Sequence, residues 1–332
     1  MKAIQIAEYG GSETLVLGEV DAPEPGEGEA LIKIAYAGVN FIDVYMRGGV
    51  FKKLDTYPNK PPFTPGMEGA GRVEAVGEGV ADLSPGDAVA YTGNGPAGSY
   101  REGRVLPRSR LVPLPDGIDE QTAAAIMLKG CTVEYLVRRT FPVHEGHVVL
   151  LHAAAGGVGL LASQWLKALG ATVIGTVGSE AKAELARANG CHHTILYREE
   201  DVAERVKQIT DGAGVHVVYD SVGAATFEGS IASLRPRGMM VTYGNASGPV
   251  PPIQPLVLAQ GGSLFLTRPK LGDYYTSAEE SADGCAALFD MVTSGKVRAH
   301  IGQTFALEHV ADAHRALEAR ETVGSTVLVV GS

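Results

Sequence analysis

A glycine-rich turn near the middle of the chain, residues 154–159, constrains the fold more than any other segment. Six mostly apolar residues, 148–153, predict a buried strand that runs into this turn. Residues 160–169 predict a helix, and residues 171–177 predict a second strand directly after it. In such a βαβ unit the turn lets backbone approach a pyrophosphate, and the helix N-terminus offers free N–H groups. The segment therefore predicts a dinucleotide site, although Ala154 replaces the first glycine of the usual G-x-G-x-x-G motif.

The end of the second strand bears on which dinucleotide is bound. A site for NAD usually carries an Asp or Glu there, roughly 20 residues past the glycines. Here the strand ends at residues 176–179, and the first carboxylate is that of Glu180, which opens the next helix. Lys182 lies one turn into that helix and would neutralise a 2′-phosphate, although exposed helical lysines are usually only solvated. The pattern favours NADP(H) over NAD(H).

Length and composition limit the class of protein. A chain of 332 residues, 45% hydrophobic and 20% charged, predicts a globular protein with two domains. The net charge of −10 argues against nucleic acid or an anionic membrane as a partner. We find neither a signal peptide nor a stretch approaching the ~20 apolar residues of a membrane span. The three cysteines are odd in number and far apart, which predicts reduced thiols in a cytoplasmic protein.

The pattern of the chain changes near residue 120. Before it, short alternating segments broken by Gly and Pro predict a small, irregular β domain. After it, strands and helices alternate, and six strands with helical crossovers predict an α/β fold with a doubly wound parallel sheet. Besides the two strands above, the expected strands are 193–196, 215–219, 238–243 and 263–267, and the expected helices are 181–188, 202–209 and 225–234.

The last part of the chain breaks this alternation. A long amphipathic helix, 277–294, is expected to close the parallel sheet. It is followed by an expected strand at 303–307, a helix at 310–319 and a final strand at 325–330. We expect this tail to return to the first domain.

Several segments carry a resemblance to a known family. Residues 146–167 fit the signature of that family without a mismatch, and the similarity runs from Met1 to the last strand. The further segments that resemble it are 128–132, 197–201, 218–223, 243–248 and 266–269. On these residues the chain resembles the zinc-free NADPH:quinone oxidoreductases, the zeta-crystallin-like group of the medium-chain dehydrogenase/reductase superfamily.

The resemblance implies a division into domains and an assembly. It implies a GroES-like, β-rich catalytic domain formed by residues 1–123 and 299–332. Residues 124–298 would form an inserted Rossmann domain that binds NADPH, with the active cleft at the junction. It also implies a homodimer, sometimes a tetramer, in which the last Rossmann strand, 263–267, pairs with its mate across a two-fold axis.

The positions that bind zinc in related alcohol dehydrogenases carry other residues here. Those enzymes use a Cys in the first domain and a His in a Gly-His-Glu motif, and the matching positions resemble Asn40 and Met67. Neither side chain can replace a thiolate or an imidazole on Zn²⁺. A four-cysteine structural lobe is also absent, since one Cys occurs before residue 190. We therefore expect no metal.

The absence of a metal ion would limit the reaction. Without a Lewis acid, reduction of a simple ketone loses several kcal/mol of transition-state stabilisation. Quinones and conjugated enones are better hydride acceptors, because they delocalise the incoming charge. Asn40 and Tyr45 are the expected catalytic residues, as hydrogen-bond donors to the developing oxyanion, with Tyr45 a possible proton source. Alternatively, Asn40 caps a turn and Tyr45 packs its ring. Glu68, beside Met67, would either orient nearby loops or have a structural role.

The resemblance also implies the cofactor contacts. Expected contacts to the pyrophosphate are Ala155, Gly156, Gly157, Val158 and Gly159. Expected contacts to the 2′-phosphate and adenine are Gly178, Ser179, Lys182, Tyr197 and Arg320, of which Arg320 would also suit a helix C-terminus alone. Expected contacts near the nicotinamide are Thr132, Val222, Gly244, Asn245, Ser247, Thr267 and Arg268, of which Arg268 could instead belong to the dimer interface.

Three functions follow from this reading. The first is NADPH-dependent, metal-free reduction of quinones. The second is reduction of the C=C bond of α,β-unsaturated carbonyl compounds with the same cofactor. The third is a mainly non-catalytic NADPH-binding or RNA-binding role, as in some crystallin relatives, which the acidic charge balance and the intact glycine turn disfavour.

Overall fold

The computed structural model describes residues 1–52, 60–93 and 96–331, which form two compact units. Unit 1 comprises the described residues of Met1–Cys131, Tyr275–Thr293 and Ala299–Ser332, and unit 2 comprises Thr132–Tyr274 and Ser294–Arg298. This division differs from the boundaries expected from the sequence mainly in helix α8 (Ala278–Thr293), which belongs to unit 1. The reason is close packing, since a Cβ on Gly130 would lie 2.4 Å from Leu288 Cδ1.

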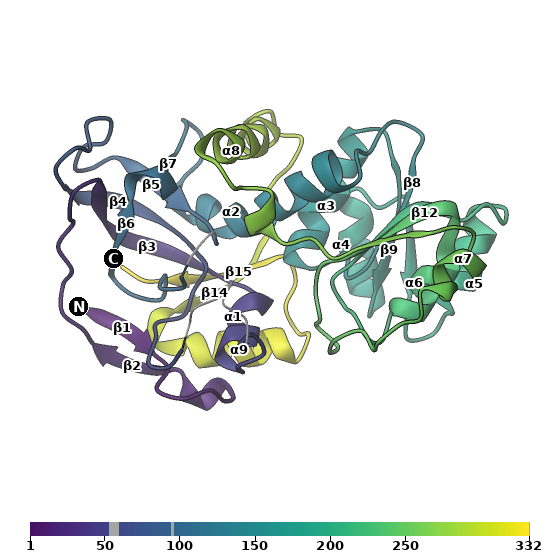
Figure 1. The fold of residues 1–332 in the computed structure, drawn as a ribbon, viewed down its shortest axis with the longest axis horizontal. Coiled ribbons are helices and arrows are strands. Elements are labelled where there is room, and N and C mark those ends of the chain that lie inside the picture. The colour runs from purple at the N-terminus through teal and green to yellow at the C-terminus, as the bar shows by residue number, and fades with distance from the viewer. Residues whose placement is uncertain (53–59, 94–95, 332) are drawn as a thin grey trace. The chain divides into compact units, whose positions relative to one another are not determined.

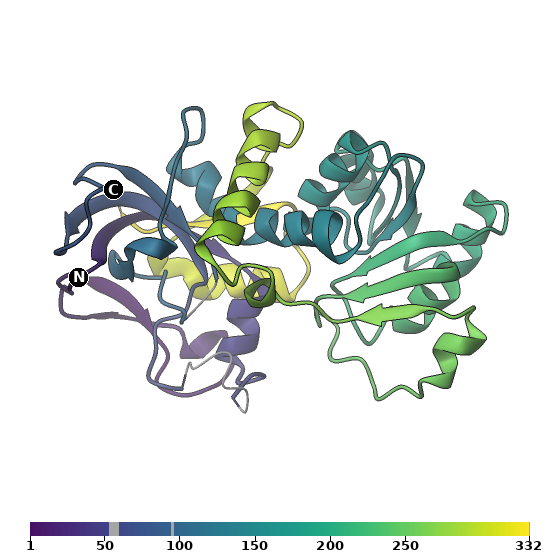
Figure 2. The same cartoon turned by 45° about the horizontal axis from the view of Figure 1, so that its top comes forward.

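Unit 2 is built on a six-stranded parallel sheet in the order β10-β9-β8-β11-β12-β13 (Figures 1 and 2). This order, with the first strand in the middle, is that of a doubly wound dinucleotide-binding fold, as the sequence predicted. Its strands are β8 (Val148–Leu151), β9 (Thr172–Val177), β10 (His193–Leu196), β11 (Val215–Asp220), β12 (Leu234–Thr242) and β13 (Phe265–Thr267). Its helices are α3 (Gly157–Ala168), α4 (Glu180–Ala188), α5 (Val202–Ile209), α6 (Phe227–Ser233) and α7 (Leu256–Gln260).

The core of unit 2 explains why these segments form strands. Leu150, Ile174, Ile195 and Val218 are fully buried in one apolar cluster, which also contains residues of the covering helices. A strand whose sheet is covered by helices on both faces has a continuous apolar sequence, because the side chains on both faces are buried.

Two element bounds near the glycine turn differ from the sequence prediction. Strand β8 ends at Leu151 rather than at residue 153, and Ala153 takes a left-handed φ of 55°. Helix α3 begins at Gly157, three residues before the expected start. Two glycines thus lie inside the helix. Tertiary packing explains the second of them, since a Cβ on Gly159 would lie 2.3 Å from the Ala153 carbonyl oxygen.

Unit 1 is mainly antiparallel. Its larger sheet has the order β14-β15-β3-β4-β5-β7, with β6 paired to β3, and β1 and β2 form a separate pair. The strands are β1 (Lys2–Gln5), β2 (Val16–Glu19), β3 (Glu29–Val39), β4 (Glu68–Val76), β5 (Ala88–Tyr91), β6 (Gly103–Pro107), β7 (Val112–Pro113), β14 (Ile301–Ala306) and β15 (Ser325–Val329). The helices are α1 (Phe41–Arg47), α8, α9 (Val310–Glu318) and most of α2 (Glu120–Tyr135).

The C-terminal tail returns to the first domain, as expected. Strand β15 pairs antiparallel with β3, with Thr326 opposite Val39. Strands β3 and β4 also pair antiparallel, and Gly38 lies opposite Glu68. These two registers bring the start of α1, the start of β4 and the tail of the chain together.

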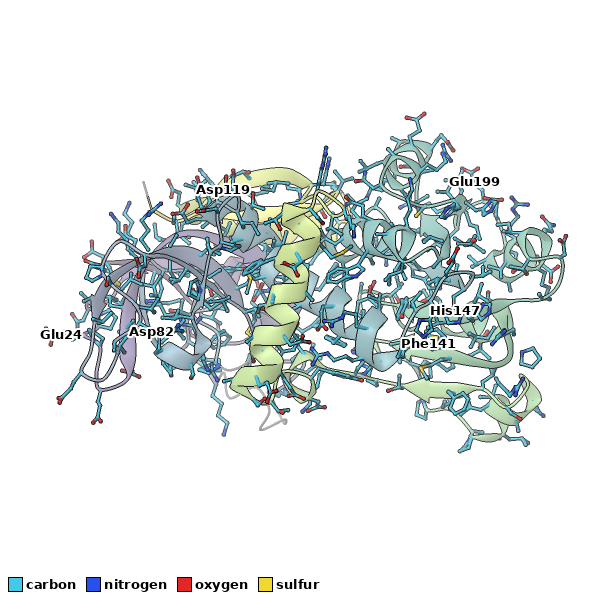
Figure 3. The ribbon with its side chains drawn as sticks, turned by 90° about the horizontal axis from the view of Figure 1, so that it is seen from above. Glu24, Asp82, Asp119, Phe141, His147 and Glu199 are labelled. Atoms are coloured by element: carbon cyan, nitrogen blue, oxygen red, sulfur yellow. The ribbon has the colours of Figure 1, made fainter. Side chains whose placement is uncertain are left out.

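The surface of unit 1 carries part of the negative charge. Glu24, Asp82 and Asp119 are exposed (Figure 3). Asp82 pairs with Arg108 at 2.8 Å, and Asp119 accepts a hydrogen bond from the Thr122 N–H at the start of α2. Asp82 and Asp119 therefore stabilise local structure at the surface.

A chain of buried polar side chains crosses the core of unit 1. The Arg47 guanidinium lies 3.1 Å from His314 Nδ1 and can only donate, so the His314 ring hydrogen is on Nε2. His314 Nε2 lies 3.4 Å from the Tyr100 hydroxyl, which donates to Asp43 Oδ2 at 3.1 Å. Burial, and then the Arg47 charge, lower the pKa of His314 to about 3. His314 is therefore neutral at pH 7.

Asp43 ends this chain in an unfavourable environment. Its Oδ2 also accepts the Asn40 backbone N–H at 2.9 Å, whereas its buried Oδ1 has no hydrogen-bond partner among the described residues. Burial raises the pKa of Asp43 from 3.8 to about 7, against the lowering effect of its two hydrogen bonds. A proton on Asp43 would thus remove a poorly compensated buried charge.

We expect Asp43→Asn to change how stability depends on pH. Because folding raises the pKa of Asp43, the wild-type protein should lose stability as pH rises from about 4 to about 7. The Tm of Asp43→Asn minus the Tm of the wild type should therefore increase by on the order of 5 °C as pH rises over this range. Thermal melts at pH 4–8 measure this difference. Asp82→Asn is the control, because Arg108 lowers the pKa of exposed Asp82 and any effect has the opposite sign. A Tm difference for Asp43→Asn that does not vary with pH contradicts the prediction.

Candidate functional site

The glycine turn of unit 2 joins the central strand β8 to helix α3. Gly156 is the N-cap of α3 in an extended conformation, and Gly157, Val158 and Gly159 form its first turn. The first N–H groups of a helix have no acceptor within the helix, so they face the turn as donors. The structure thus brings together all five residues predicted to contact a pyrophosphate, including Ala155 just before the cap. The helix dipole and these N–H groups suit an anionic group there.

The end of β9 carries the second group of predicted residues. Gly178 lies against Tyr197, since a Cβ on Gly178 would be 2.9 Å from the Tyr197 hydroxyl oxygen. Ser179 is the N-cap of α4, and its Oγ accepts the Lys182 N–H at 3.4 Å. Partial burial lowers the pKa of Lys182, with a raising effect of Tyr197 and a lowering effect of Arg198. The predicted residues Gly178, Ser179, Lys182 and Tyr197 therefore lie together.

Arg198 is a residue that sequence reasoning missed. It lies close enough to Lys182 to lower its pKa, and it is exposed. Part of the signal is in the sequence, because Arg198 follows the strand expected at 193–196, but only the structure shows that this strand pairs with β9. Glu180, the first carboxylate after β9, is ion-paired with Arg187. The end of β9 is therefore cationic.

The loops after β11 and β12 hold most of the residues predicted near the nicotinamide. Ser247 donates from its Oγ to the Val222 carbonyl oxygen at 2.8 Å. Arg268, which follows β13, donates to the Gly244 carbonyl oxygen at 3.2 Å. With its amide turned to satisfy both neighbours, Asn245 donates to Gly244 at 2.8 Å and accepts from Arg268 at 3.3 Å. Predicted residues from three loops thus form one group at the carboxyl edge of the sheet.

A buried polar network supports this edge from beneath. His152 contacts Thr176 Oγ1 through Nδ1 at 3.0 Å and Ser230 Oγ through Nε2 at 2.9 Å. Ser230 contacts Asp220, whose Oδ1 accepts the Gly223 N–H at 3.0 Å. Burial lowers the pKa of His152. These contacts tie β8, β9, β11 and α6 together, which is a structural role.

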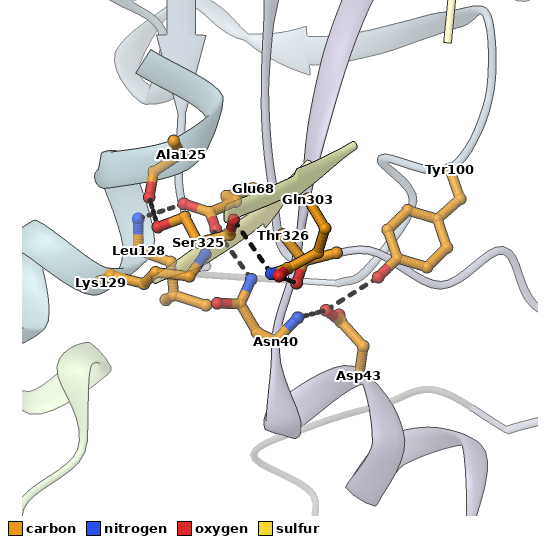
Figure 4. A network of polar contacts seen from close by, with 10 residues as sticks. All are labelled: Asn40, Asp43, Glu68, Tyr100, Ala125, Leu128, Lys129, Gln303, Ser325 and Thr326. Carbon is orange, nitrogen blue, oxygen red and sulfur yellow. Dashed lines mark hydrogen bonds and ion pairs between the residues drawn. The ribbon is translucent and has the colours of Figure 1, made fainter. Parts of the chain in front are cut away.

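Asn40 and Glu68 form the centre of a polar network in unit 1 (Figure 4). Asn40 is the N-cap residue of α1, and its Nδ2 donates to Glu68 Oε1 at 2.8 Å. The same Glu68 oxygen accepts from Lys129 Nζ at 2.6 Å, and Glu68 Oε2 accepts the Leu128 N–H at 2.6 Å. Glu68 is fully buried, and the Lys129 side chain is 7% exposed. Asn40 thus caps a helix, which is the structural alternative, and its amide N–H, the group expected to donate to an oxyanion, is engaged by Glu68.

The remaining predicted residues lie elsewhere in the two units. The Tyr45 ring, which is half-buried on α1, lies between Phe41 and Phe51, with centroids 6.0 and 5.9 Å away. Thr267 ends β13, and Thr132 lies in α2. Arg320 follows α9 in unit 1 with a left-handed φ of 61°.

Asn40 and Met67 are at the positions that resemble the zinc ligands of alcohol dehydrogenases. Met67 is buried at 1% exposure, and Asn40 is bound to Glu68. Within the described ranges, no group of three or more His, Cys, Asp or Glu side chains is arranged to hold a metal ion. Nor does any helix among these residues have the length and apolar character needed to cross a membrane.

Comparisons with known proteins agree with this geometry. Residues 26–116 match the alcohol dehydrogenase GroES-like domain, and residues 157–280 match the zinc-binding dehydrogenase family. A quinone oxidoreductase of Pseudomonas aeruginosa is 49% identical over 99% of both chains. A 2-haloacrylate reductase of a Burkholderia species is 44% identical over 98% of both chains.

Solved structures extend the likeness to the fold. The crystal structure of Escherichia coli quinone oxidoreductase complexed with NADPH is 41% identical and superimposes with a TM-score of 0.95, covering 99% of this chain and 100% of that one. The domain matches, the full-length identities and the fold indicate the same family. This chain belongs to the quinone oxidoreductase family of the medium-chain dehydrogenase/reductases.

Proposed function

We propose that this protein is an NADPH-dependent, metal-free oxidoreductase that reduces quinones. The observation that carries the proposal is the cationic end of β9, where Lys182, Tyr197 and Arg198 cluster and Glu180 is paired with Arg187. This arrangement suits a 2′-phosphate and lacks the free carboxylate that would hold a ribose hydroxyl. The relative from Escherichia coli, whose structure is a complex with NADPH, supports the same cofactor.

The glycine turn fits the rest of the cofactor. The first turn of α3 would offer backbone N–H groups to the pyrophosphate, and Gly159 allows the helix to lie close to the turn at Ala153 and Ala154. The group formed by Gly244, Asn245 and Arg268 is proposed to contact the nicotinamide side, together with Thr132, Val222, Ser247 and Thr267. Arg320 is proposed to contact the adenine side. When bound, NADPH supplies a hydride.

The residues of unit 1 are proposed to contact the substrate. Asn40 and Tyr45 would hydrogen-bond the acceptor and orient it. Because Asn40 and Met67 occupy the positions of zinc ligands, no Lewis acid is expected to polarise a carbonyl. An acceptor that delocalises charge itself, such as a quinone, would not need one.

A second candidate is reduction of the C=C bond of an α,β-unsaturated carbonyl compound. The observation in its favour is the 44% identity to a 2-haloacrylate reductase. The two reactions are separated by following NADPH oxidation with 1,4-benzoquinone, 9,10-phenanthrenequinone and a series of 2-alkenals. Faster turnover of the quinones supports the proposal, and faster turnover of the alkenals supports the alternative. Tight NADPH binding without any turnover would point to the third, non-catalytic role.

The three cysteines support a reducing compartment for the protein. Cys131, Cys191 and Cys285 are all buried free thiols, and burial raises the pKa of Cys191 to about 11, which keeps it a thiol. We propose a cytoplasmic location on this basis.

Lys182→Ala should weaken NADPH binding selectively. Losing one charged contact to the 2′-phosphate should raise the Kd for NADPH about 10-fold or more and leave the Kd for NADH nearly unchanged. A fluorescence titration with both nucleotides measures the two constants. Lys207→Ala is the matched control, because Lys207 lies on α5 of the same unit and pairs with Glu204. An equal loss for both nucleotides, or equal wild-type affinities, contradicts the cofactor assignment.

We also propose a homodimer formed through β13. This strand is at one edge of the sheet, and Phe265 on it is 57% exposed, so pairing with a second copy would cover both. Phe265→Asp should convert a dimer into a monomer in size-exclusion chromatography with light scattering. Val50→Asp, at a similarly exposed apolar residue of unit 1, should remain dimeric. A wild-type monomer, or a dimer that survives Phe265→Asp, would exclude this interface.

A further inference from the structure

The Asn40 side chain has a direction that its hydrogen bonds define. Its Nδ2 faces Glu68 Oε1 at 2.8 Å, and this carboxylate is ion-paired with Lys129 at 2.6 Å. An ionised carboxylate accepts hydrogen bonds and cannot donate them, so the amide nitrogen must face it. The amide oxygen, Oδ1, therefore points to the other side.

Glu68 cannot easily turn away to release Asn40. Besides Lys129 and Asn40, it accepts the Leu128 N–H at 2.6 Å. A Cβ on Gly38 would be 2.1 Å from the same Glu68 Oε1, so the carboxylate lies directly on the backbone of β3. A buried ion pair is weak evidence for stability, and its best attested use is to specify one arrangement.

The oxygen of the Asn40 amide is the group left for a ligand. The Asn40 side chain accepts the Asp43 N–H in the capping box at the start of α1, and an amide oxygen has a second lone pair that can accept a further hydrogen bond. Asn40 retains 8% exposure. A hydrogen-bond acceptor at this point would bind a hydroxyl group better than a carbonyl oxygen.

We propose that Glu68, held by Lys129, is a positioning residue that presents Asn40 Oδ1 as an acceptor, so that the enzyme prefers quinones whose substituent carries a hydroxyl group. This inference rests on the proposed function, and it refines the role of Asn40 from a donor to the oxyanion to an acceptor from the substrate. The hydroxyl would lie on a substituent, and the ring carbonyls would remain free to be reduced. Tyr45 would then be the donor to the developing oxyanion.

Matched substrates test the preference directly. The probes are naphthoquinones with a methyl, hydroxymethyl or methoxymethyl group at ring position 2 or at ring position 6. We expect the wild-type enzyme to show kcat/KM about 3- to 10-fold higher for a hydroxymethyl compound than for its methyl and methoxymethyl partners, as one hydrogen bond allows. The methoxymethyl compound has a polar oxygen but no O–H group, so it shows whether the preference requires a hydrogen-bond donor.

Variants test whether Glu68 sets the preference. In Glu68→Gln the new amide can donate as well as accept, so the Asn40 amide can rotate by 180° and exchange its oxygen and nitrogen. The ratio of kcat/KM for a hydroxymethyl compound to that for its methyl partner should then fall to about 1. Glu68→Gln/Lys129→Met removes both charges and should recover Tm relative to Glu68→Gln, while the preference stays lost. Glu134→Gln is the matched control, because Glu134 is also a fully buried carboxylate, paired with Arg138 and Arg139. It should lower Tm and leave the preference unchanged.

The outcomes separate this inference from the proposed function. Turnover of the quinones without any preference for hydroxymethyl compounds contradicts the inference alone. A preference that returns with Tm in the double variant shows that Glu68 is only structural, and it also overturns the inference. If Asn40→Leu raises the Kd for NADPH and slows all quinones equally, the hydroxyl belongs to the cofactor and the substrate preference is refuted. Absence of turnover with every quinone contradicts both proposals.

Discussion

The buried carboxylate of Glu68 is the constraint on which the architecture around Asn40 depends. It starts β4, lies on Gly38 of β3, accepts from Asn40 at the start of α1, and accepts from Leu128 and Lys129 on α2. Four elements from three separate parts of the sequence therefore meet at one charge. Removing any one donor would leave that charge less well compensated in the interior, which is costly. The position of Asn40 is thus fixed by the electrostatics of its neighbour as well as by its own helix.

In unit 2 the glycine turn is held in place by close backbone packing. At Gly159 the helix after β8 approaches the backbone of Ala153 and Ala154 in the turn too closely for a side chain, so its N-terminus is held at the end of the sheet. The order of the strands then places the ends of β9 and β10 on one side of that turn and the loops after β11 and β12 on the other. A ligand with an anionic middle and two different ends suits this edge, where strand order reverses. Lys182 and Arg198 make one end cationic, and Arg268 and Asn245 form the polar group at the other.

Most of the strands and helices could be predicted from the sequence, because apolar runs are local signals. The strand at 193–196 and the helix at 202–209 have the predicted bounds, and the six-stranded parallel sheet is confirmed. Errors arose where tertiary packing overrides local propensity, as at the early start of α3, which needs glycines inside a helix. Arg198 was missed because its proximity to Lys182 depends on the pairing of β9 with β10. The direction of the Asn40 amide was beyond sequence reasoning, because it depends on Glu68, 28 residues away.

The proposed chemistry rests on the resemblance of Asn40 and Met67 to positions that bind zinc in related alcohol dehydrogenases. A zinc ion attracts a carbonyl oxygen by its charge and tolerates many substrates that present one. An amide oxygen fixed by a buried carboxylate has the opposite polarity, and it selects a ligand that brings a hydrogen to it. An enzyme of the proposed kind would not polarise a poor acceptor, so it would depend on an acceptor that is already electron-poor. It can still choose among such acceptors by their substituents. In the proposed reaction, reactivity comes from the substrate and the cofactor, and selectivity comes from the network around Glu68.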